Sequence, residues 1–237
     1  ERIERDLSRR FPNARIARMD SDTMKGHEAY ERLLGRFRDG EIDILVGTQM
    51  IAKGLHFPRV SVVGVVSADT ALAIPDFRSA ERTFQLIAQV AGRAGRADKP
   101  GIALLQTYQP EHPVIRAILN GDEEGFWSAE ARERQHAGVP PYGRMAGIIL
   151  SAPEATTAFD AGNLLARQDA PLRAIGAQVF GPAPAPIARV RGRHRVRLLV
   201  KADKGVALQE ALARWIAQVR LKGDLRLTVD IDPQSFY

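Results

Sequence analysis

Three polar side chains recur at helical spacing in the middle of the chain: Gln89, Arg93 and Arg96. On a helix that turns by about 100° per residue, offsets of four and seven residues place them on one face. Gly92 and Gly95 lie beside that face without side chains, so a phosphate can approach closely. Two guanidiniums and an amide on one face suit a nucleoside triphosphate, because they can neutralise the charge that spreads over a phosphoryl group during transfer. The alternative is that the arginines only stabilise the carboxyl end of a helix dipole, which would account for one arginine better than for the whole pattern.

The elements that would position these side chains alternate between helix and strand as far as residue 108. The patterns predict helices over residues 1–11, 27–38 and 79–92, and strands over residues 15–20, 42–47, 60–67 and 102–107. This alternation indicates a parallel α/β sheet, whose working loops follow the carboxyl ends of the strands. Those loops are residues 19–23, 47–58 and 68–78. The strand at 60–67 is almost wholly apolar and is expected to be buried on both faces.

The second part of the chain has a different rhythm. A helical connector is predicted over residues 112–138, and it ends before Pro140 and Pro141, which cannot continue a helix. The pattern that follows is β-α-β-β-α-β, a split βαβ arrangement with helices on one face of an antiparallel sheet. Its Pro-rich stretch, residues 181–186, is expected to be a turn between strands. The predicted domains are residues 1–119, a connector over residues 120–143, and residues 144–237.

The positive charge is concentrated in that second part. The chain has 34 Lys and Arg against 28 Asp and Glu. From Ser151 onward it has 13 Lys and Arg against 8 Asp and Glu. Residues 189–201, here called the basic segment, contain no acid and hold six cations: Arg189, Arg191, Arg193, Arg195, Arg197 and Lys201. Arginine suits bidentate contacts with phosphate or carboxylate, so a polyphosphate or an acidic peptide is the expected partner. An edge strand that charges protect from unwanted pairing is the alternative.

Composition excludes several classes of protein. A hydrophobic content of 45% over 237 residues excludes a mainly disordered chain. No apolar run approaches the roughly 20 residues that cross a bilayer, so we expect a soluble protein. The absence of Cys excludes disulfides and thiolate metal sites in this stretch and fits the cytoplasm. The five His are scattered, and no metal ligands are predicted among them. Because Glu1 opens within a helical pattern without an initiator Met, we interpret the chain as a piece of a longer protein.

The stretch from Gln89 to Arg96 resembles motif VI of superfamily 2 helicases. Residues 46–58, Val-Gly-Thr-Gln-Met-Ile-Ala-Lys-Gly-Leu-His-Phe-Pro, are similar to motif V in the form used by the PriA family of replication-restart helicases. Residues 76–82, Asp-Phe-Arg-Ser-Ala-Glu-Arg, and residues 105–113, Leu-Gln-Thr-Tyr-Gln-Pro-Glu-His-Pro, extend the likeness. The resemblance implies a RecA-like second helicase lobe up to about residue 119, followed by the smaller α+β C-terminal domain of that family.

Roles follow from the resemblance residue by residue. Motif VI implies that Gln89, Arg93 and Arg96 face ATP, with Arg96 the stronger candidate for the arginine finger. Motif V implies that the DNA backbone is contacted by Gly47, Thr48 and Gln49. It also implies that the nucleotide side of the cleft holds Lys53, Gly54 and His56. Packing against Phe57 is an equally good interpretation of His56.

The resemblance also implies an activity and its partners. The parent would be an ATP-dependent, 3′-to-5′ DNA helicase that binds branched and single-stranded DNA, restarts replication by primosome assembly, and docks the acidic tail of single-stranded DNA-binding protein. ATP and Mg²⁺ would occupy a site completed by the first lobe. The zinc of the family would lie upstream of residue 1, with none here. Since the chain has no Gly-x-x-x-x-Gly-Lys-[Ser/Thr] loop, we expect no ATP hydrolysis from this piece alone.

Two other functions fit parts of the sequence. A nucleic-acid adaptor could keep a RecA-like shape without using ATP, and a P-loop upstream of Glu1 would exclude it. Another superfamily 2 fork-remodelling motor would share motif VI but would not be expected to have this form of motif V.

Overall fold

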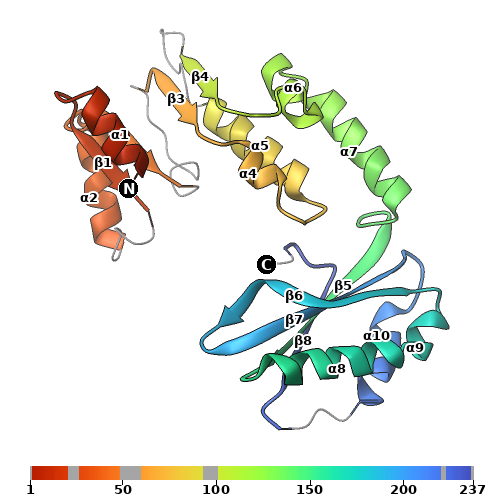
Figure 1. The fold of residues 1–237 in the computed structure, drawn as a ribbon. Coiled ribbons are helices and arrows are strands. Elements are labelled where there is room, and N and C mark those ends of the chain that lie inside the picture. The colour runs from red at the N-terminus through yellow and green to blue at the C-terminus, as the bar shows by residue number, and fades with distance from the viewer. Residues whose placement is uncertain (1, 21–26, 49–59, 93–100, 220–222, 236–237) are drawn as a thin grey trace. The chain divides into compact units, whose positions relative to one another are not determined.

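The computed structural model describes residues 2–20, 27–48, 60–92, 101–219 and 223–235 (Figure 1). Contacts within the chain divide it into two compact units. The first unit holds Glu1–Ile74 and Ser79–Asp122, and the second holds Pro75–Arg78 and Glu123–Tyr237. The chain therefore enters the second unit briefly at residues 75–78, returns to the first, and leaves it again at residue 123.

The first unit begins with two parallel strands and two helices: α1 (Arg2–Arg10), β1 (Ile16–Met19), α2 (His27–Arg38) and β2 (Ile44–Gly47). Met19 and Leu34 form the buried centre of this part. At the amino ends of the strands, the Arg15 guanidinium donates to both carboxylate oxygens of Asp43, at 2.9 and 2.7 Å. Parallel pairing of β1 with β2 confirms the predicted topology here.

A second parallel pair completes the first unit. Its elements are β3 (Val62–Val65), α4 (Asp69–Leu72), α5 (Ser79–Ala91), β4 (Ile102–Leu105) and α6 (Pro113–Asn120). Val65 and Leu105 pack with Ile87 of α5 and Ile115 of α6. The core of this part therefore lies between the two strands and these two helices.

The prediction that residues 60–67 are buried on both faces is wrong. Val62 and Val66 are 53% and 55% exposed, and Ile102 and Leu104 of the neighbouring strand are 57% and 59% exposed. Helices α5 and α6 cover only the opposite face of β3 and β4. Among the described residues, the parallel strands form two separate pairs rather than one continuous sheet.

Two helices take the place of the single predicted connector. Helix α6 ends at Gly121, which adopts a left-handed conformation with φ of 64°. Helix α7 (Glu123–Ala137) then begins the main part of the second unit. A glycine at the end of α6 stops the helix because it takes this conformation without the steric penalty that other residues meet.

The rest of the second unit is one antiparallel sheet with helices on one face (Figure 1). Its elements are β5 (Gly143–Ala152), α8 (Ala155–Arg167), α9 (Ala170–Arg173), β6 (Gln178–Val190), β7 (Arg193–Asp203), α10 (Leu208–Ala217) and β8 (Arg226–Ile231). The strand order β6-β7-β5-β8 confirms the predicted split βαβ arrangement. Trp215 of α10 is fully buried and donates its indole N–H to the carbonyl of Leu165 in α8, at 2.9 Å.

The predicted Pro-rich turn is also wrong, because residues 181–186 lie within β6. Pro184 pairs with Val196 of β7, and the register shifts on either side of it. Strand β6 is at the edge of the sheet, where a proline without an N–H does not interrupt a ladder on its outer side. The strand therefore tolerates prolines that would break a central strand.

No helix among the described residues combines the length and the apolar character needed to cross a membrane.

Candidate functional site

Gln89 lies in the last turns of α5, and its side chain is exposed. The buried side chains of this helix are Thr83, Phe84 and Ile87. At about 100° per residue, Gln89 points at least about 120° away from each of them. The amide is therefore on the solvent side of α5 and open to a ligand. Its predicted companions, Arg93 and Arg96, lie outside the described residues.

The second predicted loop starts at the carboxyl end of β2. Gly47 is the last residue of that strand, Thr48 follows it, and both are exposed. The carboxyl ends of parallel strands are where α/β sheets bind ligands. Four other candidates, Gln49, Lys53, Gly54 and His56, lie outside the described residues. Only the first two positions of this loop can thus be placed.

A hydrogen-bond network that sequence reasoning missed joins the carboxyl ends of β3 and β4. Asp69, at the start of α4, accepts from the Thr107 hydroxyl at 2.6 Å and from the Tyr108 backbone N–H at 2.9 Å. The Thr107 hydroxyl oxygen in turn accepts from the Gln109 N–H at 2.9 Å. The hydrogen bond from Thr107 lowers the pKa of Asp69 most, and the hydrogen bond from the Tyr108 N–H lowers it further. The carboxylate therefore stays ionised near neutral pH and holds the loop after β4 in place.

The basic segment forms a hairpin. It covers the end of β6, a two-residue turn at Arg191 and Gly192, and most of β7. Both turn residues have positive φ, 47° and 79°, as hairpin turns of the tightest type require. Arg189 and Arg191 are exposed at the tip. In β7, the buried Val196, Leu198 and Val200 alternate with the other cations, which therefore lie on the sheet face opposite the helices.

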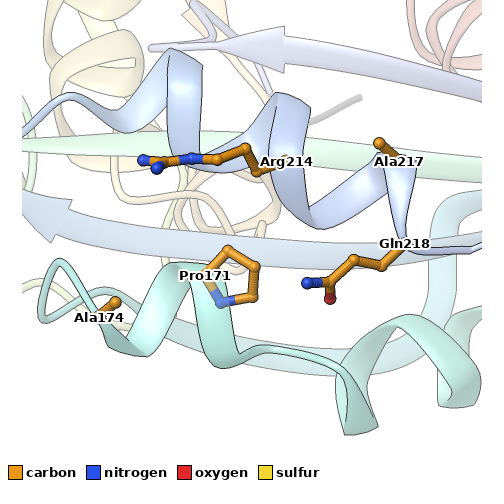
Figure 2. Close-up of a pocket in the computed structure, with 5 residues that line it drawn as sticks. All are labelled: Pro171, Ala174, Arg214, Ala217 and Gln218. Carbon is orange, nitrogen blue, oxygen red and sulfur yellow. The ribbon is translucent and has the colours of Figure 1, made fainter.

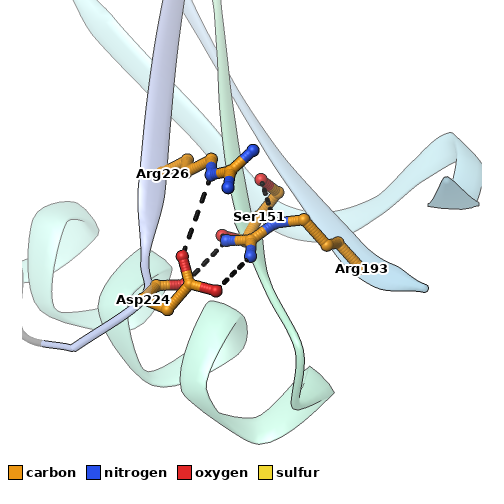
Figure 3. A network of polar contacts seen from close by, with 4 residues as sticks. All are labelled: Ser151, Arg193, Asp224 and Arg226. Atoms are coloured by element: carbon orange, nitrogen blue, oxygen red, sulfur yellow. Dashed lines mark hydrogen bonds and ion pairs between the residues drawn. The ribbon is translucent and has the colours of Figure 1, made fainter. Parts of the chain in front are cut away.

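Arg193 is held by the protein itself (Figure 3). Its guanidinium donates to the Asp224 carboxylate at 2.5 Å, and to the backbone carbonyls of Asp224 and Ser151 at 2.7 Å each. The Arg193 side chain is only 16% exposed. Its hydrogen bond lowers the pKa of Asp224, so the carboxylate stays charged and the pair stays formed. Arg193 thus links β7 to β5 and to the segment before β8.

The other cations of β7, which are Arg195, Arg197 and Lys201, also have contacts within the chain. Arg195 donates to the carbonyl of Ile187 at 3.4 Å, and Lys201 donates to the carbonyl of Ala137 at 3.0 Å. Arg197 has an internal interaction as well. The structure therefore separates a tip, Arg189 and Arg191, whose side chains face solvent, from a base whose cations take part in the fold.

A pocket of about 450 Å³ opens between α9 and α10 (Figure 2). Small side chains supply most of its walls, and Arg214 and Gln218 bring a guanidinium and an amide to it. The lining residues are Pro171, Ala174, Arg214, Ala217 and Gln218. Apolar walls beside one cation suit a short peptide that has both an apolar side chain and a carboxylate.

Metal ligands do not gather in the part of the chain that the structure describes. No group of three His, Cys, Asp or Glu there could hold a metal ion.

Two protein-family models match the chain, one on each side of residue 122. The helicase conserved C-terminal domain matches residues 1–98, which include the three residues predicted to face the nucleotide. The primosomal protein N C-terminal domain matches residues 135–234. Their order confirms the predicted fold class, a helicase lobe followed by a smaller α+β domain.

Curated relatives match nearly every residue of the chain. Replication restart protein PriA of Rickettsia felis is 39% identical over 237 residues, which are 100% of this chain and 36% of that protein. The protein of the same name from Bacillus subtilis is 40% identical, over 98% of this chain and 29% of that protein. The one from Haemophilus influenzae is 37% identical, over 99% of this chain and 32% of that protein. The chain spans about a third of the length of these relatives.

Proposed function

Because the chain belongs to the PriA family of replication restart proteins, we propose that it forms part of an ATP-dependent 3′-to-5′ DNA helicase that recognises stalled or branched replication forks and restarts replication by primosome assembly. The observation that carries this proposal is identity of about 40% along the whole chain, with both domain matches in the expected order. We propose that the protein acts in the cytoplasm.

In this proposal the first unit contributes one side of an ATP site. Gln89, Arg93 and Arg96 face the phosphates, Lys53, Gly54 and His56 lie on the nucleotide side of the cleft, and a first lobe outside this chain completes the site. Among these residues the structure describes Gln89, whose exposed position on the polar side of α5 fits such a role. When bound, Mg²⁺ would neutralise charge on the phosphates. Closure of the two lobes brings the arginines to the transferring group, so hydrolysis requires both lobes.

The loop after β2 connects this chemistry to DNA. Gly47, Thr48 and Gln49 contact the DNA backbone, and opening and closing of the cleft changes their grip on the strand. The exposed positions of Gly47 and Thr48 at the carboxyl end of β2 support this assignment.

The second unit binds branched DNA through the tip of the basic hairpin. Arg189 and Arg191 are exposed there and can reach phosphates, whereas Arg193 has its charge matched by Asp224. Arg195 and Arg197 would extend the same basic surface along β7. Contacts of this kind position DNA without reading its sequence and weaken as salt rises.

The acidic tail of single-stranded DNA-binding protein has two candidate docking places in the second unit. One is the basic hairpin, on account of its charge. The other is the pocket between α9 and α10, where Arg214 stands beside apolar walls. The pocket suits a peptide better, because it offers burial for a side chain as well as a cation for a carboxylate.

One experiment separates this function from that of an adaptor without ATP chemistry. ATP hydrolysis and fork binding are measured for residues 1–237 and for the full-length protein. We expect hydrolysis only from the full-length protein, and weaker fork binding from residues 1–237. A full-length protein that binds forks without any DNA-stimulated hydrolysis would support the adaptor instead.

A further inference from the structure

Tyr108 is an aromatic side chain on the surface of the first unit, at the carboxyl end of β4. It is 88% exposed, while the other large exposed apolar residues of the described chain are between 38% and 66% exposed. Burial of an aromatic ring contributes strongly to stability, so a ring left almost wholly in water contributes little to this fold. The ring is therefore available to a ligand rather than committed to packing.

The backbone that carries this ring is held by hydrogen bonds just before Tyr108 and at Tyr108 itself. Before it, Gln106 donates its N–H to Val65 and accepts from the N–H of Ala68, at 2.9 and 3.0 Å. At Tyr108 itself, the N–H donates to Asp69 at 2.9 Å, and the preceding Thr107 hydroxyl donates to the same carboxylate at 2.6 Å. The exposed ring therefore stands on a backbone held by four hydrogen bonds rather than on a loose loop.

A ring that is exposed but held in place is well suited to recognition. A ligand that stacks on it does not have to order the loop first, so less of the binding free energy is lost. The position beyond the carboxyl ends of two parallel strands is where such sheets bind ligands. Proteins that hold single-stranded DNA place aromatic side chains in this way, because every base has a face that can stack.

We propose that Tyr108 stacks against a base of single-stranded DNA, and that Asp69 is a positioning residue that holds it there. This inference rests on the proposed function, since it adds a base contact to the backbone contacts of the loop after β2. Asp69 touches no DNA. It acts through its hydrogen bonds to Thr107 and Tyr108.

The test compares variants of the full-length protein in binding to two oligonucleotides of equal length, one ordinary and one with an abasic stretch. Tyr108→Ala should weaken binding of the ordinary strand by about 10-fold, the scale of one lost base stack. Tyr108→Phe keeps the ring and should bind like the wild type. The control is Leu119→Ala, which removes another exposed apolar side chain from the same unit and should change nothing.

The abasic strand isolates stacking from charge. Wild type and Tyr108→Ala should bind it equally, because no base is present to stack. Asp69→Ala should weaken binding of the ordinary strand in the same direction as Tyr108→Ala, and adding Tyr108→Ala to it should cause less than the full further loss. Thermal unfolding of each variant shows that the loss of binding is not a loss of fold.

Three results would overturn the proposal. Equal binding of the ordinary strand by wild type and Tyr108→Ala would refute the proposed stacking of Tyr108 on a base. It would not bear on the proposed helicase function. A raised KM for ATP with unchanged DNA binding would assign the ring to the adenine base instead. A wild-type protein that does not bind single-stranded DNA would refute the proposed function itself.

Discussion

Arg193 and Asp224 form an ion pair in which the guanidinium also donates to the Asp224 backbone carbonyl (Figure 3). This relationship divides the basic segment into an exposed tip and a base whose cations take part in the fold. A row of arginines at alternate positions resembles a single ligand-binding surface in the sequence, yet the fold uses one of them to join strands. The tip and the base of the hairpin should therefore respond differently to substitution.

Replacing Arg193 should weaken the fold more than a surface change does. Arg193→Ala removes hydrogen bonds to Asp224 and to the Ser151 carbonyl, which should reduce the free energy of unfolding by about 1–2 kcal/mol. Urea denaturation measures this. The matched control, Arg191→Ala at the exposed tip, should change it by less than about 0.5 kcal/mol. Equal effects of the two substitutions would show that the Arg193 contacts do not stabilise the unit.

Neutralising the tip should instead change DNA binding. With Arg189→Gln and Arg191→Gln together, two phosphate contacts are lost, and the slope of log K against log salt should become shallower by about 1.8. A titration of forked DNA at several salt concentrations gives this slope. Arg167→Gln with Lys204→Gln removes two exposed charges elsewhere in the same unit and should leave the slope unchanged. An equally reduced slope for both double substitutions would mean that only the net charge of the unit matters.

The Arg193 pair should also respond to acid. Its hydrogen bond holds the pKa of Asp224 below the ordinary value of 3.8. Since the pKa is lowered in the folded state, the stabilisation is complete above about pH 4 and is lost as pH falls through the lower, folded pKa. Wild type should be more stable than Asp224→Asn at pH 6, and the difference should shrink below pH 4. A difference that stays constant between pH 6 and pH 2 would exclude this linkage.

Two glycines within helices should give opposite results when replaced by alanine. At Gly162 in α8, a Cβ would lie 2.8 Å from the Cβ of Pro182 in β6, so Gly162→Ala should destabilise the second unit by about 1–3 kcal/mol. At Gly35 in α2 nothing lies within 4 Å of a Cβ, so Gly35→Ala should stabilise by up to about 1 kcal/mol. Thermal unfolding distinguishes them. Stabilisation by Gly162→Ala would show that α8 does not pack closely on β6.

Local patterns were sufficient to predict several elements. The helix at 27–38 has the bounds of α2, because its amphipathic period and its break before a strand are both local features. The split βαβ order followed from the spacing of strands and helices in the second part. The motif residues Gln89, Gly47 and Thr48 were selected from spacing and resemblance alone; the structure shows them exposed, and their roles stay predictions.

Features that depend on distant partners could not be predicted in this way. From the sequence alone the prolines of β6 indicate a turn. They fit a strand only because β6 lies at the edge of the sheet. The valines of β3 indicate two buried faces until only one face is found to be covered. Asp69 and Thr107 are 38 residues apart, and nothing local indicates that their side chains meet. A signal for this site did exist, since Thr107 is the last residue of a predicted parallel strand, at the edge where ligands bind.

The central claim is that this chain supplies the arginine finger of an ATP site completed by another lobe. It is tested most directly by DNA-stimulated ATP hydrolysis of the full-length protein with Arg96→Ala. We expect hydrolysis to fall by about 10³-fold or more, while ATP and DNA still bind with near wild-type affinity. Hydrolysis close to the wild-type rate in a variant that folds and binds both ligands would contradict the claim and leave Arg96 with a structural role.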